Sequence, residues 1–245
     1  MAAPESVDES EIARFARDSH RWWDENGPFR PLHRLNPVRI GYIRKQAERR
    51  FGLDAKSLQP FTGLKIADIG CGGGLACEPL ARLGATVTGI DADRQAIAVA
   101  SGHARQAGLS IDYRAASVEE IKRESFDIVL ALEIVEHVAE RPGFIGHCAR
   151  LCKPGGLVVF STLNRTGRSF ALGIVAAEYV LGWVPRGTHD WRKFIRPSEL
   201  AELAAGSGLN PVDATGLVFN PLRNAFELSR RDLAVNYFLT TEKNS

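Results

Sequence analysis

Short apolar runs alternate with helical patterns over residues 63–162, and this alternation constrains the fold more than any other feature. The runs carry few charges, which indicates strands buried on both faces of a parallel sheet covered by helices. Such sheets bind ligands at the carboxyl ends of their strands. The runs predicted as strands are 64–69, 86–90, 111–113, 126–132 and 157–162. Intervening segments such as 75–83 and 94–107 predict helices.

Two further zones flank this core. Residues 1–60 predict two helices, the second of which opens at Asn36-Pro37. The adjacent Trp22 and Trp23 on the first helix fit either a packed core or a lid over an apolar ligand. Residues 163–245 contain a helix and two β-like stretches, 212–218 and 234–240, which complete a mixed sheet with an antiparallel edge.

Composition excludes several classes of protein. The formal net charge of +2 is too weak to indicate nucleic acid as a partner, so none is expected. No secretory signal or transmembrane helix is expected, since the first residues are polar and no stretch reaches about 20 apolar residues. The cysteines show neither a CxxC pair nor zinc-ligand spacing, which predicts reduced thiols in a cytosolic protein. They are Cys71, Cys77, Cys148 and Cys152.

A glycine-rich turn follows the first predicted strand. Gly70 and Gly72–Gly74 let the backbone take positive φ and approach a ligand closely. Asp91 ends the second predicted strand, where a carboxylate accepts hydrogen bonds from both hydroxyls of a ribose. A nicotinamide cofactor would require GxGxxG, but Leu75 occupies the third glycine position. The acidic Asp68 ahead of the turn instead suits a cofactor with a cationic amino group.

The D-x-G-x-G pattern with an acid after strand two resembles class I S-adenosylmethionine-dependent methyltransferases. The segments 126–129 (FDIV) and 153–156 (KPGG) resemble that superfamily's signatures at strands four and five. The resemblance implies a Rossmann-like α/β fold with a mostly parallel seven-stranded sheet and helices on both faces. It also implies an N-terminal helical lid (1–60), a methyltransferase domain (61–245) and a helical insertion after strand five (165–196).

Further segments resemble the ubiquinone-biosynthesis O-methyltransferases over roughly residues 11–240. They are RWWD (21–24), PLHRLNP (31–37), RIGYI (39–43), EHV (136–138), STLNR (161–165) and GTHD (187–190). This resemblance implies methylation of ring hydroxyls of polyprenylated phenols and catechols at both O-methylation steps of the quinone pathway. Two alternatives stay open: a methyltransferase for another small phenolic acceptor, and a non-catalytic cofactor-binding subunit of a biosynthetic complex.

The same resemblance implies which residues contact S-adenosylmethionine. Arg39 is expected to bind the cofactor carboxylate through a charge-assisted fork, unless it is a solvated helix charge. Leu132 stands where the family commonly has methionine. The complete set of expected cofactor contacts is Arg39, Asp68, Gly70, Gly72, Asp91, Ser117, Val118 and Leu132.

Three candidate catalytic residues follow the fourth predicted strand. On a helical turn, Glu133, Glu136 and His137 point the same way. The family resemblance implies that this set binds Mg²⁺, with catechol oxygens completing the coordination shell. Alternatively, His137 acts alone as the base that a phenol requires near neutral pH, or the set is structural. His189, followed by Asp190, is a further catalytic candidate.

The segment 165–196 carries an apolar stretch, 170–184 (FALGIVAAEYVLGWV), between basic flanks. It is too short to span a bilayer but suits insertion into an anionic membrane surface. The alternatives are a buried helix and a dimer contact. We therefore expect a cytoplasmic protein peripherally associated with the inner face of the membrane, and a possible association with other quinone-pathway enzymes.

Overall fold

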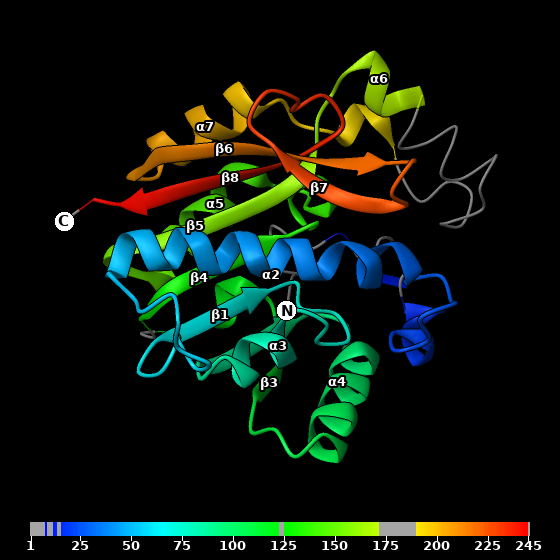
Figure 1. The fold of residues 1–245 in the computed structure, drawn as a ribbon, viewed down its shortest axis with the longest axis vertical. Helices are drawn as coiled ribbons and strands as arrows, with labels where there is room; N and C mark the ends of the chain where they lie inside the picture. The colour runs from blue at the N-terminus through cyan, green and yellow to red at the C-terminus, as the bar shows by residue number, and fades with distance from the viewer. Residues whose placement is uncertain (1–7, 9–11, 14–15, 123–124, 172–189, 245) are drawn as a thin grey trace.

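A single sheet of eight strands runs through the part of the chain that the computed structural model describes (Figure 1). The described residues are 8, 12–13, 16–122, 125–171 and 190–244. The strands are β1 (Lys65–Ile69), β2 (Thr86–Asp91), β3 (Asp112–Ala115), β4 (Phe126–Leu132), β5 (Cys152–Leu163), β6 (Leu209–Asn220), β7 (Ala225–Ser229) and β8 (Asn236–Lys243). Their order is β3-β2-β1-β4-β5-β8-β6-β7.

Strands β1 to β5 pair in parallel, whereas β8, β6 and β7 pair antiparallel at one side. The five strands predicted between residues 63 and 162 and the antiparallel edge are confirmed. The predicted total of seven strands is wrong, because residues 209–229 form a hairpin of two strands. β7 is only five residues long and none of its side chains is fully buried, so its hydrophobic pattern in the sequence is weak.

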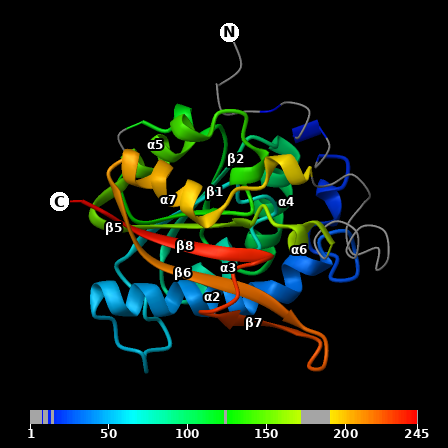
Figure 2. The same cartoon turned by 90° about the horizontal axis from the view of Figure 1, so that it is seen from above.

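Helices cover both faces of the sheet, as predicted. Helices α5 (Arg141–Leu151) and α7 (Pro197–Gly206) lie on one face, and α2 (Arg30–Phe51) and α3 (Cys77–Arg82) lie on the other (Figure 2). Each face has its own apolar cluster. The consecutive β4 residues Ile128 and Val129 belong to different clusters, since successive strand side chains point to opposite faces.

Helix α2 lies across one face of the sheet and runs from the edge where the parallel strands end to the opposite edge (Figure 1). It begins at Arg30, earlier than the predicted start at Asn36-Pro37, and Pro37 lies inside it. The Tyr42 ring stacks on Phe238 at 4.4 Å, and its hydroxyl bonds Thr240 of β8. These contacts fix α2 against the antiparallel half of the sheet.

The N-terminal tryptophans do not lie on a long helix. A 3₁₀ helix, η1 (Ser19–Arg21), precedes Trp22 and Trp23, which lie in a turn before α2. All four cysteines are buried free thiols, in agreement with the prediction of reduced cysteines. Among the described residues, no helix is both long and apolar enough to cross a membrane.

Candidate active site

The glycine turn leaves β1 at the carboxyl edge of the sheet. Gly70, Gly72 and Gly74 have φ values of 75°, 51° and 85°. The Gly70 N–H donates to the Ile90 carbonyl at 2.8 Å, which ties the turn to the end of β2. A Cβ on Gly74 would lie 2.2 Å from the Tyr113 hydroxyl, so a side chain is excluded there.

Asp91, the last residue of β2, contacts this turn directly. Its Oδ2 accepts the Gly72 N–H at 2.8 Å, and its Oδ1 accepts the Asp93 N–H at 2.8 Å. Burial raises the pKa of Asp91 to about 6, although both hydrogen bonds oppose the shift. Each carboxylate oxygen has a further lone pair, which leaves capacity for the two hydroxyls of a ribose.

Arg39 of α2 brings a buried cation to the same edge. Its side chain is only 5% exposed, and burial lowers the pKa of its guanidinium. The Glu133 carboxylate lies 3.9 Å away, beyond hydrogen-bonding distance. Within the described part of the chain, Arg39 Nε and Nη2 have no hydrogen-bond partner. An unpaired buried donor is costly, so the geometry fits an anionic group of a bound ligand here.

Asp68 lies beneath the turn and is 2% exposed. Its Oδ2 accepts a hydrogen bond from the Cys77 thiol at 3.3 Å. Burial raises the pKa of Asp68 to about 6, and the positive charge of Arg39 opposes this shift. A carboxylate between Arg39 and the glycine turn suits the ammonium group beside a cofactor's carboxylate.

The remaining predicted cofactor residues also lie at the carboxyl edge. Leu132 is the last residue of β4 and is buried. Ser117 and Val118 follow β3 and are buried at the start of η2 (Val118–Glu120). The Ser117 N–H donates to the Glu120 carboxylate at 2.8 Å, which fixes this turn. These residues therefore lie at the same edge of the sheet as the glycine turn.

Glu133 follows β4 in an unusual backbone conformation. Its φ of 54° is in the left-handed region, which is strained for a residue with a side chain. Its N–H donates to the Ser161 carbonyl at 2.9 Å. The Glu133 carboxylate accepts the Ser161 hydroxyl at 2.8 Å and the Asn236 amide at 3.3 Å on each oxygen. β5 and β8 thus hold this side chain on the side of Arg39.

Glu136 is held from the other face of the sheet. It is 2% exposed, and its Oε2 accepts the Thr162 hydroxyl at 2.7 Å. Burial raises the pKa of Glu136, while the neighbouring charge of His137 lowers it. Ser161 and Thr162 are consecutive strand residues and point to opposite faces, so their two glutamate partners diverge.

The expectation that Glu133, Glu136 and His137 point the same way on a helical turn is therefore wrong. The left-handed Glu133 precedes the turn, and only Val135–His137 form a 3₁₀ helix, η3. Within the described ranges, no three His, Cys, Asp or Glu side chains are placed to hold a metal ion. In this arrangement the residues do not fit the predicted Mg²⁺ site.

Three supporting residues of this site had no role assigned from the sequence: Ser161, Thr162 and Asn236. Ser161 and Thr162 lie in the STLNR signature, which located them but gave no function. Asn236 is 103 residues from Glu133 and reaches it only because β8 pairs antiparallel with β5. No local signal in the sequence identifies such a partner.

His189 lies outside the described residues, so its catalytic role stays a prediction. Asp190 next to it is exposed, and its Oδ1 accepts the Arg192 N–H at 2.9 Å. This bond caps a short 3₁₀ helix, η5 (Trp191–Lys193).

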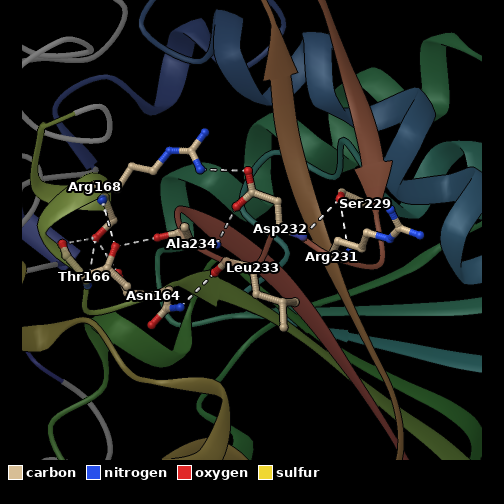
Figure 3. Close-up of polar contacts among 9 residues, drawn as sticks. Asn164, Thr166, Arg168, Ser229, Arg231, Asp232, Leu233 and Ala234 are labelled. Carbon is tan, nitrogen blue, oxygen red and sulfur yellow. Dashed lines mark hydrogen bonds and ion pairs between the residues drawn. The ribbon is translucent and has the colours of Figure 1, made fainter.

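The chain leaving β5 is fixed by the loop between β7 and β8 (Figure 3). The Asn164 amide donates to the Leu233 carbonyl at 2.8 Å, and the Thr166 hydroxyl donates to the Ala234 carbonyl at 2.6 Å. Arg168, on α6 (Gly167–Ser169), pairs with Asp232 at 2.9 Å. The start of the 165–196 segment is thus anchored to the loop that leads into β8.

The sequence matches one domain family and also known proteins along nearly its whole length. Residues 67–160 match a family model described as a methyltransferase domain. A ubiquinone biosynthesis O-methyltransferase from Dinoroseobacter shibae is 54% identical over 95% of both chains. One from Methylobacterium nodulans is 53% identical over 97% of this chain and 96% of its own.

The fold also matches solved structures. Magnesium protoporphyrin IX methyltransferase from Synechocystis PCC 6803, with bound SAH, has a TM-score of 0.68 at 16% identity. The match covers 97% of this chain and 100% of that chain. At this identity the likeness establishes a shared fold.

Together, the sheet order, the glycine turn and the domain match define an S-adenosylmethionine-dependent methyltransferase with a Rossmann-like fold. The relatives narrow this class further, since their identity exceeds one half over nearly the whole chain. This chain belongs to the ubiquinone biosynthesis O-methyltransferases. Its cofactor, S-adenosylmethionine, carries the carboxylate, ammonium and ribose groups for which Arg39, Asp68 and Asp91 are suited.

Replacing Arg39 tests the carboxylate site. We predict that Arg39→Met lowers the affinity for S-adenosylhomocysteine by about tenfold or more, because a charge-assisted hydrogen bond is lost. Unfolding of the ligand-free variant should require as much free energy as the parent or more, since a buried unpaired charge is removed. Titration calorimetry and urea unfolding measure the two quantities.

Arg44→Met is the matched control, because Arg44 lies on the same helix and pairs with Glu48 at 2.7 Å. It should leave the affinity for S-adenosylhomocysteine unchanged. Equal affinities for the parent and Arg39→Met would contradict the assignment of Arg39 to the cofactor carboxylate.

The raised pKa of Asp91 predicts that a change in pH shifts the folding stability and the affinity for S-adenosylhomocysteine in opposite directions. In the ligand-free protein the folded state binds more protons than the unfolded chain between about pH 4 and 6, so Asp91 favours folding less as pH rises. Cofactor binding requires the carboxylate, so affinity for S-adenosylhomocysteine should fall as pH decreases through 6. Calorimetric titrations from pH 7.5 to 5 test this.

Asp91→Asn should bind S-adenosylhomocysteine more weakly at pH 7.5. The number of protons released on binding should fall by about one, which makes the affinity less dependent on pH. Asp68, whose pKa is also raised to about 6, accounts for the slope that remains. An unchanged slope in Asp91→Asn would show that Asp91 is not the titrating group.

Proposed function

We propose that this enzyme transfers a methyl group from S-adenosylmethionine to ring hydroxyls of polyprenylated phenols and catechols, at both O-methylation steps of ubiquinone biosynthesis. The observation that carries the proposal is the identity of 54% over 95% of both chains with a relative of that name. The acidic and basic side chains after β4, next to the cofactor turn, support it independently.

We propose a contact with S-adenosylmethionine for each residue of the predicted set. The cofactor supplies an already activated methyl group, so the protein contributes chiefly by positioning the two reactants. Arg39 binds its carboxylate, Asp68 lies by its ammonium group, and Asp91 accepts from its ribose hydroxyls. Gly70, Gly72, Leu132, Ser117 and Val118 line the remaining surface.

A phenol hydroxyl must lose its proton for the reaction to proceed. Phenols have pKa values near about 10, so a base is required near neutral pH. We assign this role to His137, because imidazole exchanges protons in that range. Buried Glu136 precedes His137 in the chain. The proton taken from the phenol stays on His137 until it is released to solvent.

Glu133 is held toward Arg39 by Ser161 and Asn236. We assign it to orienting the acceptor hydroxyl beside the cofactor. The described positions of Glu133, Glu136 and His137 do not fit Mg²⁺, so we assign the metal no role. A catalytic role of His189 stays a prediction from the family resemblance.

An activity assay tests the acceptor and the base together. The protein with S-adenosylmethionine and a short-chain polyprenyl catechol should yield the ring methyl ether, detected by mass spectrometry. His137→Gln should lower kcat by about 100-fold or more, since general base catalysis is removed. Its affinity for S-adenosylhomocysteine should stay unchanged, which serves as the control for folding.

A parallel assay contains a chelator. Turnover that is insensitive to chelator removes the predicted role of Mg²⁺, and turnover that Mg²⁺ restores establishes it. Failure to methylate any phenol or catechol would reject the proposed function in favour of a non-catalytic subunit.

We also propose peripheral association with anionic membranes through the segment 165–196. Most of its apolar stretch lies outside the described residues (172–189). At its described ends, Phe170 is 49% exposed, and Arg168, Arg192 and Arg196 are exposed. A polyprenylated acceptor is embedded in membrane, so an enzyme at the surface reaches its head group without extracting the tail. An association with other quinone-pathway enzymes stays a prediction.

Flotation with vesicles tests this association. The protein should float with phosphatidylglycerol vesicles and not with phosphatidylcholine vesicles, because the flanks are basic. The double variant Trp183→Ala, Arg186→Glu should lose flotation, whereas Arg105→Glu, on helix α4 (Arg94–Gln106) outside this segment, should retain it. No flotation of the parent, or no effect of the double variant, would reject the proposal.

A further inference from the structure

The residues between η1 and the first turns of α2 attach to the cofactor turn and the loops beside it. We call residues 19–36 the N-terminal strap. The Ser19 hydroxyl donates to Asp93 Oδ2 at 2.5 Å. The Trp23 indole donates to the Gly73 carbonyl at 3.0 Å, and the Asn36 amide donates to the Leu75 carbonyl at 2.7 Å. The strap thus spans the glycine turn and the start of α4.

Trp22 covers the glycines themselves. A Cβ on Gly72 would lie 2.4 Å from Trp22 Cζ2, and a Cβ on Gly73 would lie 2.4 Å from Trp22 Cβ. The indole also stacks on the buried Phe29 ring at 3.8 Å, with 8° between the planes. These contacts fix the ring over Gly72, whose N–H binds Asp91.

The indole N–H of Trp22 is a buried donor without an acceptor among the described residues. Native proteins satisfy nearly all buried donors, so an exception calls for an explanation. Its neighbour Trp23 has a partner, the Gly73 carbonyl. Arg39 offers further unpaired buried donors from α2, toward the same edge. Both residues present donors where a ligand with carboxylate and ribose oxygens binds.

We propose that Trp22 is a further cofactor-binding residue, whose indole N–H donates to an oxygen of bound S-adenosylmethionine. The ring covers the glycine turn. The strap therefore contributes to the cofactor site as well as to the core. This inference depends on the cofactor alone and is independent of the acceptor.

If Trp22 were only a packing residue, its N–H would contribute nothing to cofactor affinity. Trp22→Phe separates the two roles, because phenylalanine keeps an aromatic ring over Gly72 and removes the donor. Affinity for S-adenosylhomocysteine should fall about three- to tenfold, the usual effect of one hydrogen bond. The denaturant midpoint of the ligand-free protein should stay near that of the parent, since no protein hydrogen bond is lost.

Trp191→Phe is the matched control and should show the reverse pattern. The Trp191 indole donates to the Thr166 carbonyl at 2.9 Å, so its loss lowers the denaturant midpoint. The affinity for S-adenosylhomocysteine should stay unchanged. Affinity of Trp22→Phe within twofold of the parent would overturn the proposal, whatever happens to the acceptor reaction.

A measurement on the parent protein covers the case in which Trp22→Phe folds poorly. The chain has four tryptophans, so ¹⁵N spectra contain few indole signals. The Trp22 indole proton should move downfield when S-adenosylhomocysteine binds and exchange more slowly with solvent. An indole signal that neither moves nor gains protection would overturn the proposal.

Discussion

The parallel pairing of β1 between β2 and β4 is the constraint on which the rest of the site depends. Ile69 lies level with Ile90 on one side and Ala131 on the other. The residues that follow these positions therefore emerge together at the carboxyl edge, which places Asp91 and Leu132 on either side of the glycine turn. The other residues that we propose for cofactor binding lie at the same edge of the sheet.

Helix α2 completes the cofactor site at the expense of stability. It brings the buried guanidinium of Arg39 to a point where the described protein gives it no hydrogen bond. Tyr42 on the same helix bonds Thr240 and stacks on Phe238. These contacts hold α2, and with it Arg39, in place. The strap adds the Trp22 indole N–H over the glycines, a further donor without a partner among the described residues. Arg39 and Trp22 thus preorganise the site for an anionic and oxygen-rich ligand.

The acceptor side depends on the antiparallel half of the sheet. β8 places Asn236 against Glu133, while β5 divides its contacts between Glu133 through Ser161 and Glu136 through Thr162. Because consecutive strand residues face opposite ways, the two glutamates have different environments. Glu133 faces Arg39, and Glu136 is buried beside His137, where burial raises its pKa. In the mechanism that we propose, this division separates the residue that orients the acceptor from the residues that take up its proton.

The sequence alone determined the parallel core, the glycine turn and its acid, and the family, because these features are local patterns with fixed spacing. It did not determine the β7 strand, which has no buried side chain, or the start of α2 ahead of Pro37. The helical spacing of Glu133 and Glu136 also predicted the wrong geometry for Glu133. Tertiary contacts with Ser161 hold this residue at φ 54°, outside any helix. Only the tertiary structure decided that Asn236 supports Glu133 and that Trp22 covers the glycines. Such partners meet through strand pairing and helix packing, and no sequence interval encodes that proximity.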